Sequence, residues 1–256
     1  MPIACITGAT SGIGRAAVER FVREGWLVVA VGRREDRLRE LKDEFPGSVI
    51  ETLALDVRDR DCVLTAFGAL EERYSASDTE PLVVLVNSAG LALGLEPAQE
   101  CSLEDWETMV DTNVKGLMFC TRALLPGMVR RGFGHVVNIG SIAGSYAYPG
   151  GNVYGASKSF VLQFSRGLRC DLHGTGVRVT NIEPGLLETE FSSVRFKGDE
   201  ERAASVYRGT KPLTASDIAD IIWWVVATPA HVDITQVEVM PTTQSLGATR
   251  VFKEEV

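Results

Sequence analysis

Short apolar runs alternate with longer stretches of helical character along almost all of this 256-residue chain. The expected strands are Ile3–Ile6, Leu27–Val31, Val49–Leu55, Leu82–Val86, His135–Ile139, Val177–Ile182 and Gln236–Val239. The expected helices are roughly 12–24, 34–45, 59–74, 103–130, 152–173 and 214–228. Such alternation favours a parallel sheet with helices on both faces. We predict an α/β fold, a single doubly wound domain over 1–256 with about seven strands, because this length is near the upper size of one core.

One segment interrupts the alternation. Leu186–Lys211 follows Pro184-Gly185 and carries mixed charge and aromatic residues. Long segments of this kind inside a compact domain are usually functional. We expect a helical lid or loop near the site, at about residues 186–211.

Composition excludes several classes of function. The net charge of −8 argues against broad nucleic-acid binding. The longest apolar runs, Leu82–Val86 and Ile221–Ala227, are far shorter than the roughly 18 residues of a membrane span. Pro2–Thr7 already resembles a strand rather than a signal peptide. Five cysteines without a C-x-x-C pair indicate reduced thiols and a cytoplasmic protein, and the three separated histidines show no metal motif.

A glycine-rich turn follows the first expected strand directly. Its spacing is G-x-x-x-G-x-G, and small residues there let the backbone approach a phosphate while the next helix directs its N-terminus at the anion. An ordinary tight turn is the alternative. The residues expected to bind a dinucleotide here are Gly8, Thr10, Ser11, Gly12, Ile13 and Gly14.

The end of the second expected strand indicates which dinucleotide is bound. An acidic residue there would bind the ribose 2′-hydroxyl of NAD, whereas arginine accommodates the 2′-phosphate of NADP. The chain has Arg33 and Arg34 at this point and no carboxylate. We predict NADP, with two solvated arginines on a surface loop as the alternative.

The next two strand ends add candidate cofactor contacts. Asp56 and Val57 close the third strand, where an adenine would lie. Asn87, Ala89 and Gly90 close the fourth, with small residues where the backbone would meet the cofactor. We predict that all five contribute to cofactor binding.

Four polar residues suit proton transfer to or from an alcohol oxygen. Tyr154 and Lys158 are an i, i+4 pair, so both project from one face of a helix. The pKa of tyrosine is ordinarily about 10, and a nearby cation such as Lys158 lowers it. Ser141 can hydrogen-bond the substrate oxygen, and Asn113 can hold a water that links Lys158 to solvent. Taken alone, the Tyr-Lys pair has an amphipathic surface pair as its alternative.

In this order the motifs resemble the short-chain dehydrogenase/reductase family, over essentially the whole chain. They are Thr7-Gly8-x-x-x-Gly12-x-Gly14, Asp56-Val57, Asn87-Ser88-Ala89-Gly90, Asn113, Ser141, Tyr154-x-x-x-Lys158 and Pro184-Gly185-x-x-x-Thr189. Ser88 departs from the second asparagine that is commoner in the family.

The resemblance implies a Rossmann-type domain and a role for each polar residue. It makes Tyr154 the acid/base and Ser141 the residue that orients the substrate oxygen. Lys158 then lowers the tyrosine pKa and binds the nicotinamide ribose, and Asn113 completes a proton relay. The resemblance also adds three cofactor contacts: Pro184, Gly185 and Thr189.

A narrower resemblance is to the NADP-dependent 3-hydroxy acid dehydrogenases, which act on serine and allo-threonine and reduce malonic semialdehyde. It implies a β-hydroxy acid oxidised at C3, or the reverse reaction, in a homotetramer. The segments that carry it are 32–38, 90–94, 105–109, 150–155 and 194–199.

A hydroxy acid needs a cation for its carboxylate. Arg195 and Lys197 lie in the segment that interrupts the alternation, and we expect Arg195 to be that cation. Lys197 or backbone amides near Gly150-Gly151 come next. The alternative for both side chains is an exposed charged loop or a subunit contact.

Two other functions remain open at this point. One is a 3-oxoacyl reductase of the same family acting on carrier-bound chains, which would need a basic docking patch. The other is a non-catalytic NADP-binding protein that senses redox state.

Overall fold

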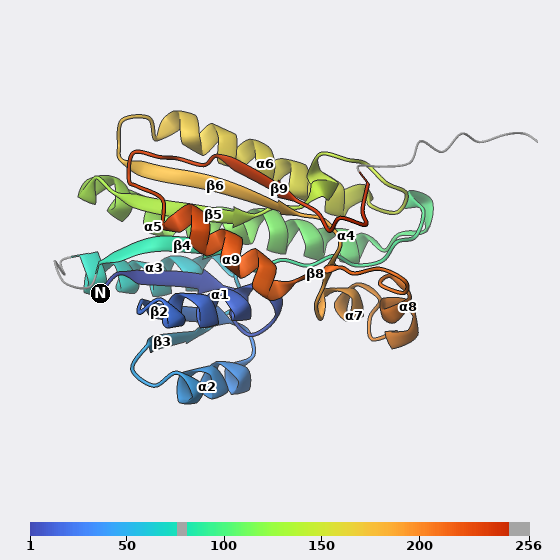
Figure 1. Cartoon of the computed structure of the whole chain (residues 1–256), viewed down its shortest axis with the longest axis horizontal. Coiled ribbons are helices and arrows are strands. Elements are labelled where there is room, and N and C mark those ends of the chain that lie inside the picture. The colour runs from blue at the N-terminus through green and yellow to red at the C-terminus, as the bar shows by residue number, and fades with distance from the viewer. Residues whose placement is uncertain (76–80, 246–256) are drawn as a thin grey trace, which may run out of the picture.

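Seven parallel strands form the centre of the molecule, in the order β3-β2-β1-β4-β5-β6-β9 (Figure 1). The computed structural model describes residues 1–75 and 81–245, so the predicted domain over 1–256 extends beyond them at 76–80 and 246–256. The strands are β1 (Ile3–Thr7), β2 (Leu27–Gly32), β3 (Val49–Ala54), β4 (Leu82–Asn87), β5 (Gly134–Ile139), β6 (Val177–Pro184) and β9 (Gln236–Val239). The predicted α/β fold with about seven parallel strands is confirmed.

The central strands β1, β2 and β4 are almost wholly apolar on both faces because helices cover both faces. In β1, Ala4 and Ile6 belong to one core cluster, whereas Ile3 and Cys5 belong to the other. This follows from the two-residue period of a strand. The first cluster packs against α1 (Gly12–Arg23), α2 (Glu35–Glu44) and α9 (Ala215–Val226). The second packs against α3 (Arg60–Ser75), α5 (Leu117–Arg131) and α6 (Asn152–Asp171).

The order of the strands positions the site. From β1 the chain moves outward through β2 and β3, and from β4 it moves outward in the opposite direction through β5 and β6. The crossover helices therefore diverge at the carboxyl ends of β1 and β4 and leave a crevice there. Ligands of open α/β sheets bind in this crevice.

The expected helix over 103–130 differs from the observed one. After the short 3-10 helix η1 (Ala98–Glu100), the structure has α4 (Leu103–Val110), a π-helical segment η2 (Asp111–Gly116) and then α5. A π-helical turn holds an extra residue and shifts the side chains that follow it, and such turns often occur at functional sites. Asn113 lies within η2.

The segment expected to be a lid or loop contains short elements beyond the carboxyl end of the sheet (Figure 1). They are the strand β7 (Leu187–Glu188) and the helices α7 (Phe191–Arg195) and α8 (Glu200–Ser205), and β7 pairs with β8 (Leu213–Thr214), which follows the segment. The 3-10 helix η3 (Ile142–Gly144) follows β5 at the same end of the sheet.

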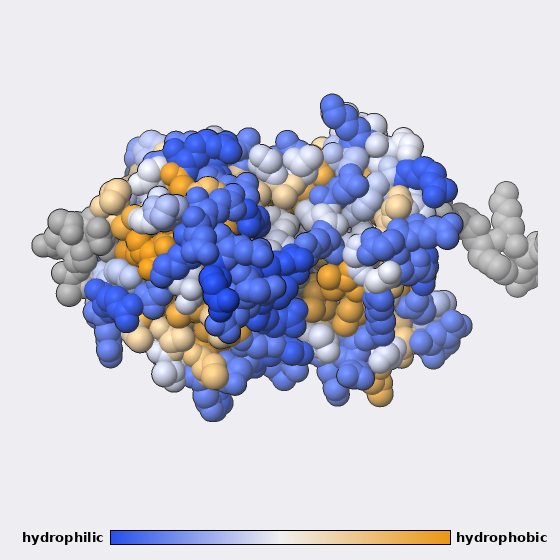
Figure 2. Space-filling view, turned by 90° about the horizontal axis from the view of Figure 1, so that it is seen from below, coloured by the Kyte–Doolittle hydropathy of each residue, from blue (hydrophilic) through white to orange (hydrophobic). Residues whose placement is uncertain are grey.

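Polar and charged side chains cover most of the face shown in Figure 2, with separate apolar areas between them. Among the described residues, no helix combines the length and apolar character that crossing a membrane requires.

Candidate active site

A cavity of about 600 Å³ lies at the carboxyl ends of the central strands, and its wall includes most of the predicted site residues. Those that line it are Gly8, Thr10, Ser11, Gly12, Ile13, Arg33, Arg34, Asp56, Val57, Ala89, Gly90, Ser141, Tyr154, Lys158, Pro184, Gly185, Thr189 and Arg195. Gly14, Asn87 and Asn113 are not part of this lining.

The glycine-rich turn has the geometry that its glycines require. Gly8 and Gly12 have positive φ angles of 68° and 50°, which glycine adopts without strain. A Cβ on Gly14 would lie 2.3 Å from the carbonyl oxygen of Gly8, so only glycine lets α1 pack this closely against the turn. Ser11 precedes α1 without capping it through its side chain, which leaves the first amides of the helix directed toward the cavity edge. The turn thus fits a phosphate group.

The two predicted arginines differ in their surroundings. Both line the cavity, but the guanidinium of Arg33 is exposed and makes no hydrogen bond or ion pair with any described residue. Arg34 donates from Nε and Nη2 to Thr10 Oγ1, at 3.2 and 3.1 Å. Thr10 therefore holds Arg34 against the glycine-rich turn.

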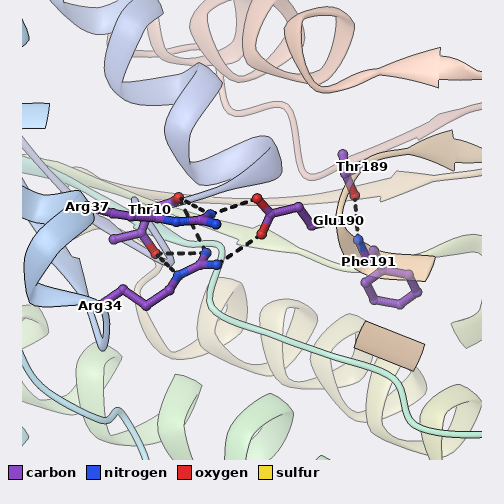
Figure 3. A network of polar contacts seen from close by, with 6 residues as sticks. All are labelled: Thr10, Arg34, Arg37, Thr189, Glu190 and Phe191. Carbon is purple, nitrogen blue, oxygen red and sulfur yellow. Dashed lines mark hydrogen bonds and ion pairs between the residues drawn. The ribbon is translucent and has the colours of Figure 1, made fainter. Parts of the chain in front are cut away.

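Sequence reasoning missed two further charged residues beside Arg34. Glu190 accepts from Arg34 Nη1 at 3.0 Å and from Arg37 Nη1 at 2.7 Å (Figure 3). Partial burial opposes its ionisation, but the bonds from Arg37 and Arg34 outweigh this and lower the pKa of Glu190. Glu190 joins the 186–211 segment to the end of β2. Since more than 150 residues separate the partners, no local motif could have predicted the contact.

The two buried asparagines, Asn87 and Asn113, support the cavity from behind. Asn87 donates to Thr121 Oγ1 and to Asn138 Oδ1, so its side chain faces the interior rather than the cavity. Asn113 Oδ1 accepts from the backbone N–H of Leu91 at 2.9 Å, and its Nδ2 donates to the carbonyl of Leu91 at 2.8 Å.

Asn113 and Lys158 approach each other around Gly90. A Cβ at Gly90 would meet Asn113 Oδ1 at 3.2 Å and Lys158 Nζ at 3.5 Å. Lys158 Nζ donates to the carbonyl of Ile139 at 2.8 Å. Because β5 ends at Ile139, this bond ties the lysine to the end of that strand.

The phenol of Tyr154 lies among Ser141, Lys158 and Arg195. Tyr154 and Lys158 are adjacent on α6, with Nζ 5.8 Å from the ring centroid. Ser141 begins η3, and its hydroxyl accepts from the N–H of Ala143 at 3.1 Å. The hydroxyl keeps its own proton free to donate. The predicted serine, tyrosine and lysine are thus brought together at one wall of the cavity.

The electrostatics at Tyr154 differ from the expectation. Burial raises the pKa of Tyr154 to about 12, against the opposing effects of a hydrogen bond donated by Ser141 and the charge of Arg195. Burial also lowers the pKa of Lys158 to about 8. In the protein without cofactor, removal from water therefore dominates the pKa of Tyr154, and the lowering of that pKa by Lys158 stays a prediction for the NADP-bound protein.

Arg195 projects into the same cavity from α7. Its guanidinium carbon lies 5.2 Å from the ring centroid of Tyr154, and Nη2 donates to Tyr148 Oη at 2.6 Å. Its Nε is buried and has no hydrogen-bond acceptor among the described residues. A buried donor without an acceptor is costly, so this Nε fits a ligand oxygen. The sequence did not single out Tyr148, which lines the cavity and orients this arginine.

The other candidates for a carboxylate contact lie elsewhere. Lys197 Nζ forms an ion pair with Asp105 Oδ2 at 2.8 Å, and its side chain is 62% exposed. Gly150 and Gly151 are not in the cavity wall. Of the two cations considered for the substrate carboxylate, Arg195 lies next to the phenol of Tyr154, whereas Lys197 does not line the cavity.

Comparison with known proteins agrees with this geometry. A family model described as short chain dehydrogenase matches residues 2–200. A 3-hydroxy acid dehydrogenase of Salmonella typhi, the NADP-dependent YdfG, is 56% identical over 252 residues, 98% of this chain and 99% of that protein. Sulfoacetaldehyde reductase 2 of Chromohalobacter salexigens is 50% identical over 254 residues, covering 98% of this chain and 99% of its own.

A solved structure is similarly close. The closed form of a serine dehydrogenase complexed with NADP+ superposes with a TM-score of 0.91 at 52% identity. The match covers 98% of this chain and all of the other.

Proposed function

Because this chain belongs to the short-chain dehydrogenase family, we propose that it moves a hydride between NADP(H) and C3 of small 3-hydroxy acids. The substrates would be of the serine, allo-threonine or 3-hydroxypropionate type. The observation that carries the proposal is Arg195, a cation that lines the cavity beside Tyr154 and whose buried Nε has no acceptor among the described residues. An anion bound to Arg195 presents its neighbouring carbons to the phenol.

The residues present fit an NADP molecule. Gly8, Gly12 and Gly14 form the turn that suits its pyrophosphate, and Arg33 and Arg34 supply positive charge at the end of β2. Lys158 lines the same cavity, where it would bind the nicotinamide ribose. The relatives above are named for NADP, and one was solved with it.

The side chains divide the proton chemistry among them. When bound, NADP+ supplies the hydride acceptor for the substrate C3–H. Ser141 donates a hydrogen bond to the substrate oxygen, and Tyr154, as the phenolate, takes the hydroxyl proton as the carbonyl forms. Lys158 would pass that proton toward solvent through a water held near Asn113, whose Oδ1 approaches Gly90 from the other side. In the reverse direction the neutral phenol, favoured by its raised pKa, donates the proton to the forming alkoxide.

The names of the relatives support an anionic substrate. One acts on 3-hydroxy acids and another on sulfoacetaldehyde. Malonic semialdehyde and sulfoacetaldehyde both carry an anionic group one methylene away from an aldehyde. A guanidinium can bind either anion through paired N–H groups, so Arg195 accounts for both substrates.

The 186–211 segment would cover the substrate, since Leu187, Thr189, Phe191 and Arg195 all line the cavity.

We further propose a cytoplasmic homotetramer. Free thiols in all five cysteines support the compartment. Exposed apolar side chains such as Leu103 (71%) and Trp224 (54%) support subunit contacts. Light scattering should give four times the chain mass, and a monomer would contradict this assembly.

The function is tested by following reduction of NADP+ and NAD+ with a panel of 3-hydroxy acids and their methyl esters. We expect turnover of the acids with NADP+ and at least tenfold lower kcat/KM for the esters. Sulfoacetaldehyde belongs in the panel for the reductive direction. Equal activity on acids and esters, or an equal rate with NAD+, would contradict the proposal.

A further inference from the structure

Glu190 lies where the cofactor arginines and the substrate-covering segment meet. Its carboxylate faces the guanidinium groups of both Arg34 and Arg37, one oxygen to each (Figure 3). Arg34 is at the end of β2, Arg37 is on α2, and Glu190 directly precedes α7. One carboxylate thus connects two parts of the chain that are distant in sequence.

Arg34 uses all three of its side-chain nitrogens on Glu190 and Thr10, whereas Arg37 uses Nη1 alone. Arg34 places Nε and Nη2 on Thr10 and Nη1 on Glu190. Arg37 Nη1 reaches Glu190 Oε1 at 2.7 Å and the carbonyl of Thr10 at 3.4 Å. Thr10 therefore fixes the position of the cations, and Glu190 supplies the negative charge between them.

A carboxylate between two arginines has the chemistry of a bound phosphate. Arginine binds carboxylate and phosphate through the same fork of N–H groups. Arg34 is also one of the residues assigned to the 2′-phosphate of NADP. That phosphate needs the donors that Glu190 now holds, whereas the 2′-hydroxyl of NAD does not.

We propose that Glu190 competes with the 2′-phosphate of NADP for Arg34 and Arg37, and so reduces the preference for NADP over NAD. This inference rests on the proposed cofactor. It makes Glu190 and Arg37 specificity-determining residues, although the carboxylate belongs to the substrate-covering segment. Arg33, which is unpaired among the described residues, remains available to the phosphate throughout.

The position of Glu190 also links cofactor selection to the substrate wall. Its neighbour Thr189 lies 3.5 Å from the position of a Cβ on Gly12 in the glycine-rich turn. On the other side, the ring of Phe191 lies 5.6 Å from that of Tyr154, and Arg195 lies over Phe191 at 5.6 Å. Glu190 therefore lies in the chain segment that connects the two halves of the cavity.

The test compares the Kd of NADP+ and of NAD+, measured by calorimetry, for the wild type and Glu190→Gln. We expect NADP+ to bind three- to tenfold more tightly to the variant, about the effect of removing two exposed ion pairs. The Kd of NAD+ should change less than twofold. Unchanged or weaker NADP+ binding would overturn the competition, and so would equal tightening of both cofactors.

Glu188→Gln is the matched control, because it removes the same charge two residues away. Its exposed side chain makes no hydrogen bond or ion pair with any described residue. It should alter the Kd of NADP+ less than twofold. An effect as large as that of Glu190→Gln would reduce the role of Glu190 to general charge and overturn the inference.

A second comparison asks whether the effect acts through the arginines. In an Arg34→Gln, Arg37→Gln background, Glu190→Gln should no longer tighten NADP+ binding, and persistent tightening would overturn the inference. The two levels of proposal fail separately. A wild type that binds NAD+ as well as NADP+ contradicts the cofactor assignment, whereas a selective wild type with an unresponsive Glu190→Gln contradicts only the competition.

Discussion

Tyr154 and Lys158 are both displaced toward their uncharged forms. Burial raises the pKa of the phenol to about 12 and lowers the pKa of the ammonium to about 8. The two groups lie in one wall of the cavity, and burial is the largest cause of both pKa shifts. A neutral phenol beside a lysine that deprotonates readily is prepared to donate a proton to a forming alkoxide.

The ionisation of Tyr154 can be measured in the protein without cofactor. Phenolate absorbance near 295 nm, wild type minus Tyr154→Phe, should stay flat between pH 8 and 10, because burial keeps the pKa of Tyr154 at about 12. A rise of this absorbance difference to that of one full tyrosinate between pH 8 and 10 would contradict the prediction. It would mean that the charge of Lys158 lowers the pKa of Tyr154 more than burial raises it.

The same substitution tests the role of the hydroxyl in catalysis. Tyr154→Phe keeps the ring that packs against Phe191 and removes only the group that carries the proton. We expect kcat to fall by about 10²–10⁴-fold while the Kd of NADP+ stays within twofold. A variant that keeps a tenth of the wild-type kcat would remove Tyr154 from the acid/base role.

Among the helices, strands and turns, sequence patterns predicted those whose formation depends on residues close together in the chain. The two-residue period of the strands and the glycines of the first turn predicted the sheet and the edge where the cavity lies. The sequence predicts one helix over 103–130 and does not predict the π-helical segment η2 within it. The one extra residue of a π-helical turn hardly changes the helical pattern of the sequence.

Contacts between distant segments were beyond sequence reasoning. Arg37 and Glu190 meet across 153 residues, and Tyr148 meets Arg195 across 47. Arg37, Glu190 and Tyr148 carry no signal of a site in their own segments, and only the tertiary fold makes them part of it. Asn87 follows the family pattern, yet the fold turns its side chain to the interior.

Gly14 tests the packing of the first turn against α1. Gly14→Ala would bring a methyl group within 2.3 Å of the Gly8 carbonyl oxygen, so we expect a loss of about 1–3 kcal/mol in unfolding free energy. The Kd of NADP+ should rise at least tenfold. Gly68→Ala on α3 is the control, since its Cβ would meet nothing within 4 Å. It should be neutral or stabilising by up to about 1 kcal/mol.

Over the whole molecule, a net charge of −8 coexists with a cavity for two anions. Arg33, Arg34 and Arg195 all line that cavity, so the positive charge is local where the total is negative. Local charge at short range dominates over the screened field of distant surface groups. An acidic protein can therefore bind an anionic cofactor beside an anionic substrate.

Stability should depend on pH through His135, which is buried in the sheet. Burial, and to a lesser degree the charge of Arg178, lower the pKa of His135 to about 3. An unfolded histidine has a pKa near 6.5, so the unfolded chain takes up the extra proton first. The contribution of neutral His135 to the free energy of unfolding is therefore fully present above pH 6.5 and is lost as the pH decreases toward 3.

Urea unfolding at pH 7 and pH 5.5 measures this effect. Because of His135, the free energy of unfolding of the wild type should be about 1 kcal/mol lower at pH 5.5 than at pH 7. His135→Gln should lose that part of the pH dependence, whereas His173→Gln, at an exposed position, should keep it. Equal pH dependence in the wild type and His135→Gln would contradict the assignment.

Under the proposed function, Arg195 selects an acid for the chemistry at Tyr154. The most direct measurement of this selection is the ratio of kcat/KM for a 3-hydroxy acid to that for its methyl ester, in the wild type and in Arg195→Ala. The variant should lose a charge-assisted pair, and therefore about 10-fold or more of this ratio, mainly through a higher KM for the acid. The Kd of NADP+ should be unchanged. An equal loss on acid and ester would show that the carboxylate is held elsewhere and would contradict the claim.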